Sequence, residues 1–306
     1  MEKEFKGKLL LYYNPYSGSG SIKDNLDHII DRCQQAGYAV MPLRAEREIT
    51  IDDVMGKFDE KDFKRIIVSG GDGTIHKLVN AMMKHDVHVP IGLMPSGTAN
   101  DFAFYFEIDS DIDAALDVAL GNKTTMADVA RINDRYFINV CAMGAMVGVS
   151  QKTDPQLKNA LGPLAYYLKA ATELPQVHGI PMKLTTPDQV IDEEFYFLTV
   201  MNGESAGGFR KLSPSSSMND GKLDVVAFKK MPIMEFGPLL FEVVNGRHPQ
   251  NRNVLYFQTE TLDVESPEDI LTDVDGEKGE KLPLHFSVVK KHLEVFVSEK
   301  TWTYDD

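Results

Sequence analysis

Arg65-Ile-Ile-Val-Ser-Gly-Gly-Asp-Gly-Thr-Ile-His-Lys-Leu-Val-Asn80 joins a short apolar run to a glycine-rich turn and then to a helical pattern. The run Ile66 to Val68 is β-branched, which is typical of a strand buried on both faces of a parallel sheet. The glycines of the turn Gly70 to Gly73 allow successive backbone N–H groups to face an anion. Thr74 can cap the following helix, whose N-terminus also favours phosphate. The stretch therefore predicts a phosphate-binding turn.

Asp72 distinguishes this turn from an ordinary connection between a strand and a helix. A carboxylate among amides that hold phosphate is costly unless a metal ion or a proton transfer requires it. The alternative is that Asp72 only forms the turn. We expect it to hold magnesium at the phosphates or to pair with a substrate hydroxyl.

Two further stretches repeat the plan of apolar strand and small-residue turn. Pro90-Ile-Gly-Leu-Met-Pro-Ser-Gly-Thr-Ala-Asn-Asp-Phe-Ala103 carries Thr98, Asn100 and Asp101 in its turn, and Asn14-Pro-Tyr-Ser-Gly-Ser-Gly20 follows a strand that ends at Tyr13. Asn100 and Asp101 can either cap the next helix or face a substrate.

The elements of the first part alternate strictly. Strands are predicted at 8–13, 39–43 and 65–68, and helices at 21–36, 52–58, 74–84 and 111–120. Such alternation predicts a doubly wound, Rossmann-like α/β domain, whose ligands bind beyond the carboxyl ends of the strands. All three turns stand at such ends, so that one nucleotide could contact all of them.

From Thr125 onward the chain consists of short strands with polar turns, which predicts a C-terminal antiparallel β-sandwich. Strands are expected at 125–132, 136–140, 182–186, 195–201, 223–228, 254–264 and 293–297. We place the α/β domain at 1–125 and the sandwich at 126–292. Two amphipathic helices, 162–174 and 233–245, interrupt it and either cover a sheet face or border a lipid-accessible cleft.

Length and composition agree with two globular domains. The chain has 306 residues, of which 43% are hydrophobic and 25% charged. We expect no signal peptide, because Met1 to Lys8 is charged and leads directly into a strand, and the longest apolar run, Ile138 to Val149, is too short to span a bilayer. We expect a cytoplasmic protein with Cys33 and Cys141 reduced. The net charge of −14 argues against nucleic acid as a partner.

The three turns together resemble a known family. Asn-Pro-x-Ser-Gly, Gly-Gly-Asp-Gly-Thr and Pro-x-Gly-Thr-Ala-Asn-Asp-Phe-Ala, in this order, look like the diacylglycerol kinase catalytic family, in particular its soluble bacterial lipid kinases, related to sphingosine and ceramide kinases. The resemblance extends to Asp220-Gly-Lys-Leu-Asp224 and Asp275-Gly-Glu277. It implies an ATP-dependent kinase that phosphorylates a lipid hydroxyl, most simply that of diacylglycerol, with the last strand, about 293–306, returning to the first domain.

The resemblance also assigns the nucleotide contacts. In the family the Gly-Gly-Asp-Gly-Thr loop and a threonine matching Thr98 bind ATP. The family usually has Asn and then Glu where this chain has His76 and Lys77, and a threonine where it has Arg44. The nucleotide-binding candidates are Asn14, Arg44, Gly70, Gly71, Asp72, Gly73, Thr74, Ile75, His76 and Thr98.

Two acidic turns of the second domain have implied roles. Turn chemistry alone explains Asp220-Gly221, but the resemblance implies a structural Mg²⁺ held by Asp220 and the carbonyls of Ser217 and Lys222, oxygen ligands that suit this cation. The three carboxylates of Asp273, Asp275 and Glu277 repel one another unless a proton or a cation is near. A solvated acidic hairpin is the simple explanation; the resemblance implies Glu277 as general base with Asp275 supporting it.

Three functional classes remain after these arguments. The leading one is a lipid kinase that reaches its substrate transiently at the membrane surface, as a homodimer if it follows its family. Because anionic surfaces attract basic patches, an acidic chain needs a local patch or an apolar dock for this. NAD kinase shares the Gly-Gly-Asp-Gly-Thr turn, although Pro95 to Ala103 argues against it. The third is a catalytically idle nucleotide- or lipid-binding protein, which His76, Lys77 and Arg44 suggest and Asp72, Asp220 and Glu277 oppose.

Overall fold

The computed structural model describes residues 5–18, 21–45, 48–144, 147 and 178–299. The chain forms two compact units, one of residues 1–129 and 290–306 and the other of residues 130–289. We call them the N-terminal and the C-terminal unit. Strands β5 (Thr124–Ile132) and β15 (Leu284–Phe296) each contribute residues to both units.

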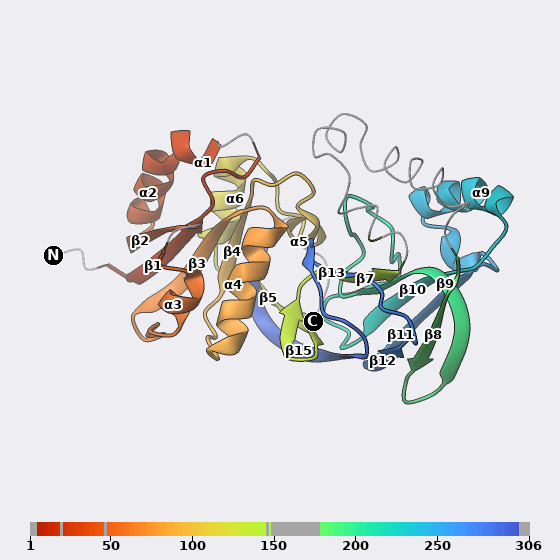
Figure 1. Cartoon of the computed structure of the whole chain (residues 1–306). Helices are drawn as coiled ribbons and strands as arrows, with labels where there is room; N and C mark the ends of the chain where they lie inside the picture. The colour runs from red at the N-terminus through yellow and green to blue at the C-terminus, as the bar shows by residue number, and fades with distance from the viewer. Residues whose placement is uncertain (1–4, 19–20, 46–47, 145–146, 148–177, 300–306) are drawn as a thin grey trace. The chain divides into compact units, whose positions relative to one another are not determined.

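The N-terminal unit is built on parallel strands in the order β15-β4-β3-β1-β2 (Figure 1). Their inner residues, such as Leu9 to Leu11 and Ile66 to Val68, are fully buried, as their β-branched and leucine side chains require. The strands are β1 (Gly7–Tyr13), β2 (Tyr38–Arg44), β3 (Phe63–Gly70) and β4 (Ile91–Pro95).

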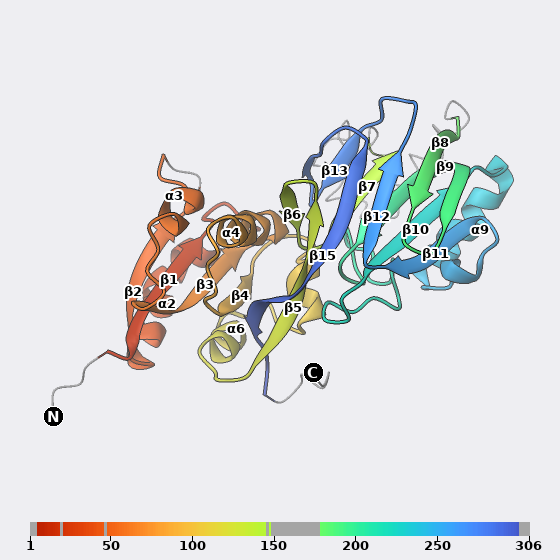
Figure 2. The ribbon, with the colours of Figure 1, turned by 90° about the horizontal axis from the view of Figure 1, so that it is seen from below.

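Helices cover both faces of this sheet. Figure 2 shows α3 and α4 on one face and α2 and α6 on the other, the arrangement of a doubly wound fold, which confirms the predicted class. The helices are α1 (Ser21–Asp24), α2 (Leu26–Gln35), α3 (Ile51–Met55), α4 (Asp72–Lys84), α5 (Asp101–Tyr105) and α6 (Ile112–Ala119).

The C-terminal unit is the predicted antiparallel sandwich. Strand β9 pairs with β8 through its first half and with β7 and β10 through its second, so that it turns the corner between the two sheets. The strands are β6 (Arg135–Phe137), β7 (Val140–Gly144), β8 (Ile180–Thr185), β9 (Val190–Met201), β10 (Leu223–Lys229), β11 (Val254–Thr259), β12 (Thr261–Glu265), β13 (Thr272–Val274) and β14 (Glu277–Lys278).

Two apolar clusters stabilise this unit. The larger fills the sandwich and includes Phe137, Phe195 and Phe286. The smaller lies between the sheet and helix α9 (Ile233–Val244), which is followed by a short 3₁₀ turn, η2 (His248–Gln250). Among the described residues, no helix is long and apolar enough to cross a membrane. The predicted helix 162–174 lies outside the described residues.

Several predicted boundaries were wrong for local reasons. The helix expected at 21–36 is interrupted at Asn25. The strand expected at 254–264 divides at Glu260 into β11 and β12. The strand expected at 136–140 ends at Phe137, because the next three backbone N–H groups bond to a carboxylate from another turn. The last strand begins at Leu284, earlier than the predicted 293.

Candidate active site

Three turns meet at the carboxyl edge of the N-terminal sheet. The backbone N–H of Asn14 donates to the Ser69 carbonyl at 2.8 Å, and that of Ser96 donates to the Gly70 carbonyl at 3.0 Å. The Asn14 side chain also donates to Thr74 Oγ1 at 3.4 Å. These bonds bring the turns after β1, β3 and β4 together, as the positions of the three motifs predicted.

The glycines of the central turn have different surroundings. A Cβ on Gly70 would lie 2.4 Å from the Thr74 side chain, and one on Gly71 would lie 3.0 Å from the Gly97 Cα. Gly70 therefore makes room for the Thr74 side chain of the following helix, and Gly71 allows its turn to pack against the turn that carries Gly97. A Cβ on Gly73 would meet no atom within 4 Å, although Gly73 lies in the first turn of α4. Its backbone is open to a ligand.

The helix caps differ from the prediction. Thr74 does not cap α4: the N-cap is Gly71, without a side-chain bond, and Thr74 is buried inside the helix. The Thr74 N–H donates to the Gly71 carbonyl at 2.9 Å. The N–H groups of Asp72 and Gly73, to which the N-cap residue Gly71 offers no side-chain acceptor, carry the polarity at the start of the helix that attracts an anion.

The side chains of Asp72 and Asn100 both hydrogen-bond to backbone groups of the turn after β4 and of the start of α5. Asp72 Oδ1 accepts the backbone N–H of Phe102 at 3.0 Å, which ties the start of α4 to the start of α5. Asn100, in the left-handed conformation, closes its own turn by accepting from the Gly97 N–H at 2.8 Å and donating to the Gly97 carbonyl at 3.0 Å. Asn100 therefore occupies the N-cap position of α5 but does not cap the helix with its side chain, and Asp101, 4% exposed, is buried beside it.

The other nucleotide candidates are divided between the core and the surface. Ile75 and His76 are 1% and 3% exposed, so only their backbone can reach a ligand without rearrangement. Thr98 is exposed on its turn. Arg44 ends β2 and places its guanidinium over the ring of Tyr16 at 5.0 Å, with Lys23 over the same ring at 4.8 Å. The edge thus carries two cations beside the glycine turns.

A small cavity at the same edge was not anticipated. It is lined by Ser69, Ser96 and Ser110 among apolar residues. The Ser96 hydroxyl is buried and has no hydrogen-bond partner among the described residues. The Pro95-Ser96 pair within the third motif was the only signal for it, and serine in a turn has a simpler explanation.

In the C-terminal unit, Asp275 organises the acidic hairpin. Its carboxylate accepts the backbone N–H groups of Ile138, Asn139 and Val140 at 2.7, 3.0 and 2.9 Å. Asp275 itself has a positive φ of 50°. Three such bonds hold the hairpin against β7.

The Glu277 side chain faces the guanidinium of Arg135, whereas Asp275 faces backbone N–H groups. Glu277 is the first residue of β14, its side chain is 43% exposed, and a carboxylate oxygen lies 3.5 Å from Arg135 Nη2. The Asp273 carboxylate instead accepts the Gly276 N–H at 2.8 Å. The three acids therefore each face a donor, and the repulsion expected from their spacing is relieved in this way.

At the Asp220 turn, oxygen atoms of three residues accept hydrogen bonds from the side-chain amide of Gln258. Asp220 Oδ1 accepts the Lys222 N–H at 2.9 Å, and Gln258 Nε2 donates to Asp220, to the Ser215 carbonyl and to Asp224 at 3.3, 3.4 and 3.4 Å. Asp224 is fully buried and also accepts from the Tyr256 hydroxyl. Burial raises the pKa of Asp224 and, with the nearby Asp224 carboxylate, raises that of Tyr256 to about 12.

The carboxylate and carbonyl oxygens of the Asp220 turn are ligand types that fit a hard divalent cation. Carboxylate and carbonyl oxygens are the ligands that Mg²⁺ takes. Ser217, the other residue that we expected to contribute a carbonyl, stands in the same loop, where its hydroxyl donates to Asn219 at 2.6 Å.

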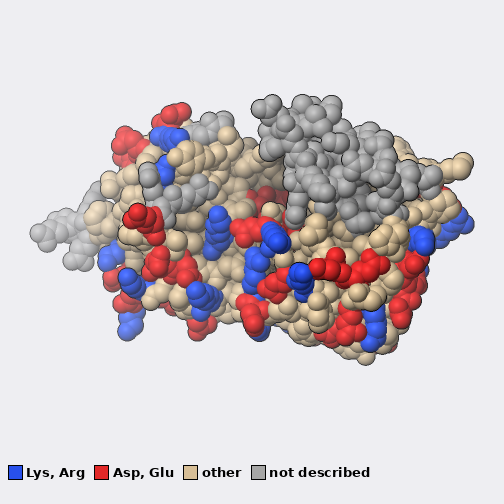
Figure 3. Space-filling model, in the orientation of Figure 1, with Lys and Arg blue, Asp and Glu red and all other residues tan. Residues whose placement is uncertain are grey.

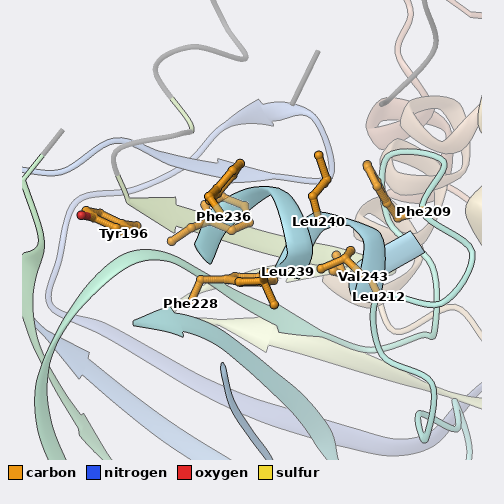
Figure 4. A pocket seen from close by; sticks show the side chains of 9 residues that line it. Tyr196, Phe209, Leu212, Phe228, Phe236, Leu239, Leu240 and Val243 are labelled. Carbon is orange, nitrogen blue, oxygen red and sulfur yellow. The ribbon is translucent and has the colours of Figure 1, made fainter. Parts of the chain in front are cut away.

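An apolar cavity lies beneath α9 in the C-terminal unit. Figure 4 shows α9 above the strand that carries Phe228, with Tyr196 at one end of the cavity and Phe209 and Leu212 at the other. Helix α9 contributes Phe236, Leu239, Leu240 and Val243. With almost no polar surface, the cavity suits a hydrocarbon chain.

One cluster of metal-ligand types lies apart from these sites. Asp86, His88 and His292, in the N-terminal unit, bring their donor atoms within 4.8 Å of one another. Asp86 and His88 are exposed. Sequence spacing could not indicate this cluster, because His292 comes from β15.

Comparison with known proteins agrees with both halves of this architecture. Residues 8–132 match the diacylglycerol kinase catalytic domain, and residues 139–297 match the YegS C-terminal NAD kinase beta sandwich-like domain. A diacylglycerol kinase of Staphylococcus haemolyticus (strain JCSC1435) is 33% identical over 93% of this chain and 86% of its own length. One of Staphylococcus aureus (strain MRSA252) is 32% identical over 94% and 91%.

A solved structure supports the same relationship. The crystal structure of a diacylglycerol kinase from Bacillus anthracis str. Sterne superposes with a TM-score of 0.79 at 25% identity, covering 95% of this chain and 97% of that one. Identity at this level over nearly the whole of both chains reflects a shared family rather than a shared fold alone. The chain belongs to the diacylglycerol kinase family and is a lipid kinase.

Proposed function

We propose that this lipid kinase transfers the γ-phosphoryl group of ATP to the free hydroxyl of diacylglycerol. The observation that carries the proposal is the junction of the three turns, where the open backbone of Gly73 stands at the N-terminus of α4. Arg44 and Lys23 add positive charge at the same edge. N–H groups and cations arranged in this way suit a polyphosphate.

The phosphate end of the reaction is assigned to the N-terminal unit. The first-turn N–H groups of α4 bind phosphate oxygens, and Asn14 and Thr98 contribute from the flanking turns. Asp72, whose Oδ1 accepts the Phe102 N–H, would hold the Mg²⁺ that accompanies ATP. Bound there, a divalent cation would supply positive charge beside the phosphates.

The acceptor end is assigned to the C-terminal unit. Glu277 removes the proton from the lipid hydroxyl, and Asp275 holds the hairpin that carries it. The cavity beneath α9 is the candidate site for an acyl chain, because its lining is apolar. Asp220 and the carbonyls of Ser217 and Lys222 would hold a second Mg²⁺, which would stabilise the loop before β10.

The test is an acceptor panel with ATP and Mg²⁺ that contains diacylglycerol, ceramide, sphingosine and NAD. The expected product is phosphatidic acid, formed faster than any other phosphorylated acceptor. Formation of NADP instead would favour the NAD kinase-like reading. Binding of ATP or lipid without turnover of any acceptor would indicate an idle binding protein and overturn the proposal.

A further inference from the structure

Helix α9 has apolar side chains on two opposite faces. Its inner face, with Phe236, Leu239 and Val243, packs on the sheet and lines the cavity. On the outer face, Met234, Phe241 and Val244 are 86%, 69% and 50% exposed. Residues at i, i+7 and i+10 share one side of a helix, so the three form a continuous stripe. We call it the outer stripe of α9; an exposed stripe of this kind marks a docking surface.

The charges around the outer stripe distinguish a lipid surface from other partners. Residues 229–252 contain four Lys and Arg and two Glu. Lys229 and Lys230 form ion pairs with Glu193 and Glu194 of β9. Arg252 pairs with Glu235, so Arg247 is the cation of this segment that stands outside these three ion pairs. Figure 3 shows Lys and Arg side chains beside the tan surface at the end of the C-terminal unit where α9 lies. Local cations beside an apolar helix face favour an anionic bilayer, to which the rest of this acidic chain is not attracted.

The two glutamates of α9 do not interrupt the stripe. Glu235 bonds to Arg252 at 2.8 Å and to Asn253 at 2.6 Å, and Glu242 bonds to Asn251 at 2.7 Å. Both carboxylates thus lie on the flank that faces the loop after η2. Arg247 is exposed just past the C-terminus of the helix, and Lys211 lies against Gly246 there.

We propose that α9 is an interfacial helix that inserts its outer stripe into the acyl region of an anionic membrane, with Arg247 and Lys211 at the headgroups. The helix then separates the bilayer from the apolar cavity beneath it. An acyl chain that enters this cavity does not have to cross an aqueous surface. The role of α9 in delivering an acyl chain rests on the proposed function. Docking of the helix on a membrane does not depend on catalysis.

Insertion is tested with tryptophan reporters. The chain has one tryptophan, Trp302, which is replaced by Phe in all reporters. Phe241→Trp reports on the outer stripe, and Val190→Trp is the matched control, because Val190 is 60% exposed in the same unit on β9. Vesicles of phosphatidylglycerol and phosphatidylcholine with brominated chains should quench the Phe241→Trp reporter and leave the control unquenched. Equal emission of both reporters with and without vesicles would overturn the proposal.

Affinity is measured by vesicle flotation. The double variant Met234→Ser/Phe241→Ser should bind about 100-fold more weakly, about ten-fold per apolar side chain removed from lipid, whereas Val190→Ser binds like wild type. The same variant should retain turnover of a water-soluble short-chain diacylglycerol. If the double variant bound vesicles as tightly as wild type, the outer stripe would not be a lipid-binding surface. Conversion of a dimer into a monomer by these substitutions would overturn the proposal in the same way. Absence of any diacylglycerol turnover in wild type would refute the proposed function and leave the quenching result standing.

Discussion

A substitution at Gly73 can test phosphate binding without disturbing the fold. Gly73 lies in the first turn of α4 without a positive φ, and a Cβ there meets no protein atom within 4 Å. Alanine is the better helix former by up to about 1 kcal/mol. Gly73→Ala should therefore fold as stably as wild type or slightly more so, with a melting temperature up to roughly 2–4 °C higher.

The same substitution should weaken ATP binding. The methyl group would occupy the space through which the phosphates approach the α4 N–H groups. Loss of one hydrogen bond to a charged group costs about 1.5–3 kcal/mol, or roughly ten- to a hundred-fold in Kd. Gly70→Ala and Gly71→Ala cannot make this distinction, because their Cβ atoms would collide with Thr74 and Gly97.

Calorimetric titration with ATP and Mg²⁺, alongside thermal unfolding, measures both effects. Gly237→Ala is the matched control: Gly237 is also helical and its Cβ also meets nothing within 4 Å, but it lies in the other unit. It should leave ATP affinity unchanged. Wild-type ATP affinity in a folded Gly73→Ala protein would show that no phosphate approaches this turn.

Three further perturbations test other parts of the molecule. Glu277→Gln should retain ATP binding and lower kcat about 10²- to 10⁴-fold in a lipid phosphorylation assay; near-normal turnover, with loss in Asp72→Asn, would transfer the role of base to Asp72. Asp220→Ala should abolish the rise in melting temperature that Mg²⁺ gives the protein, and a wild-type melting temperature indifferent to a chelator would mean that the turn holds no metal. Burial lowers the pKa of His248, which is fully buried and bonds the Leu212 carbonyl. Its contribution to stability is therefore present above the unfolded pKa of about 6.5 and is lost as pH falls toward the folded pKa, with a slope of up to about 1.4 kcal/mol per pH unit. Urea unfolding between pH 7.5 and 5.5 should show this slope in wild type and a shallower one in His248→Gln; identical slopes would exclude His248 as its source.

The sequence predicts the N-terminal unit well because its signals are local. Runs such as Leu9 to Leu11 and Ile66 to Val68 are long enough to indicate buried strands, and glycine turns follow them directly. Their positions at strand ends suffice to place Asn14 and Thr74 together in a parallel sheet.

The remaining features depend on contacts between distant residues. Asp275 interrupts a strand by binding the N–H groups of residues 138–140, which no local pattern encodes. Likewise, Asp72 reaches Phe102, and Gln258 reaches Asp220. The amphipathic pattern of 233–245 indicated a buried face, but the exposure of Met234 and Phe241 on the other side required the packed structure.

The most direct measurement follows the γ-phosphate. Wild-type protein is incubated with γ-labelled ATP, Mg²⁺ and diacylglycerol in anionic vesicles, and ADP and labelled lipid are quantified together. One labelled phosphatidic acid should form for each ADP. ADP without labelled lipid, or label in a soluble acceptor in place of the lipid, would contradict the proposed function.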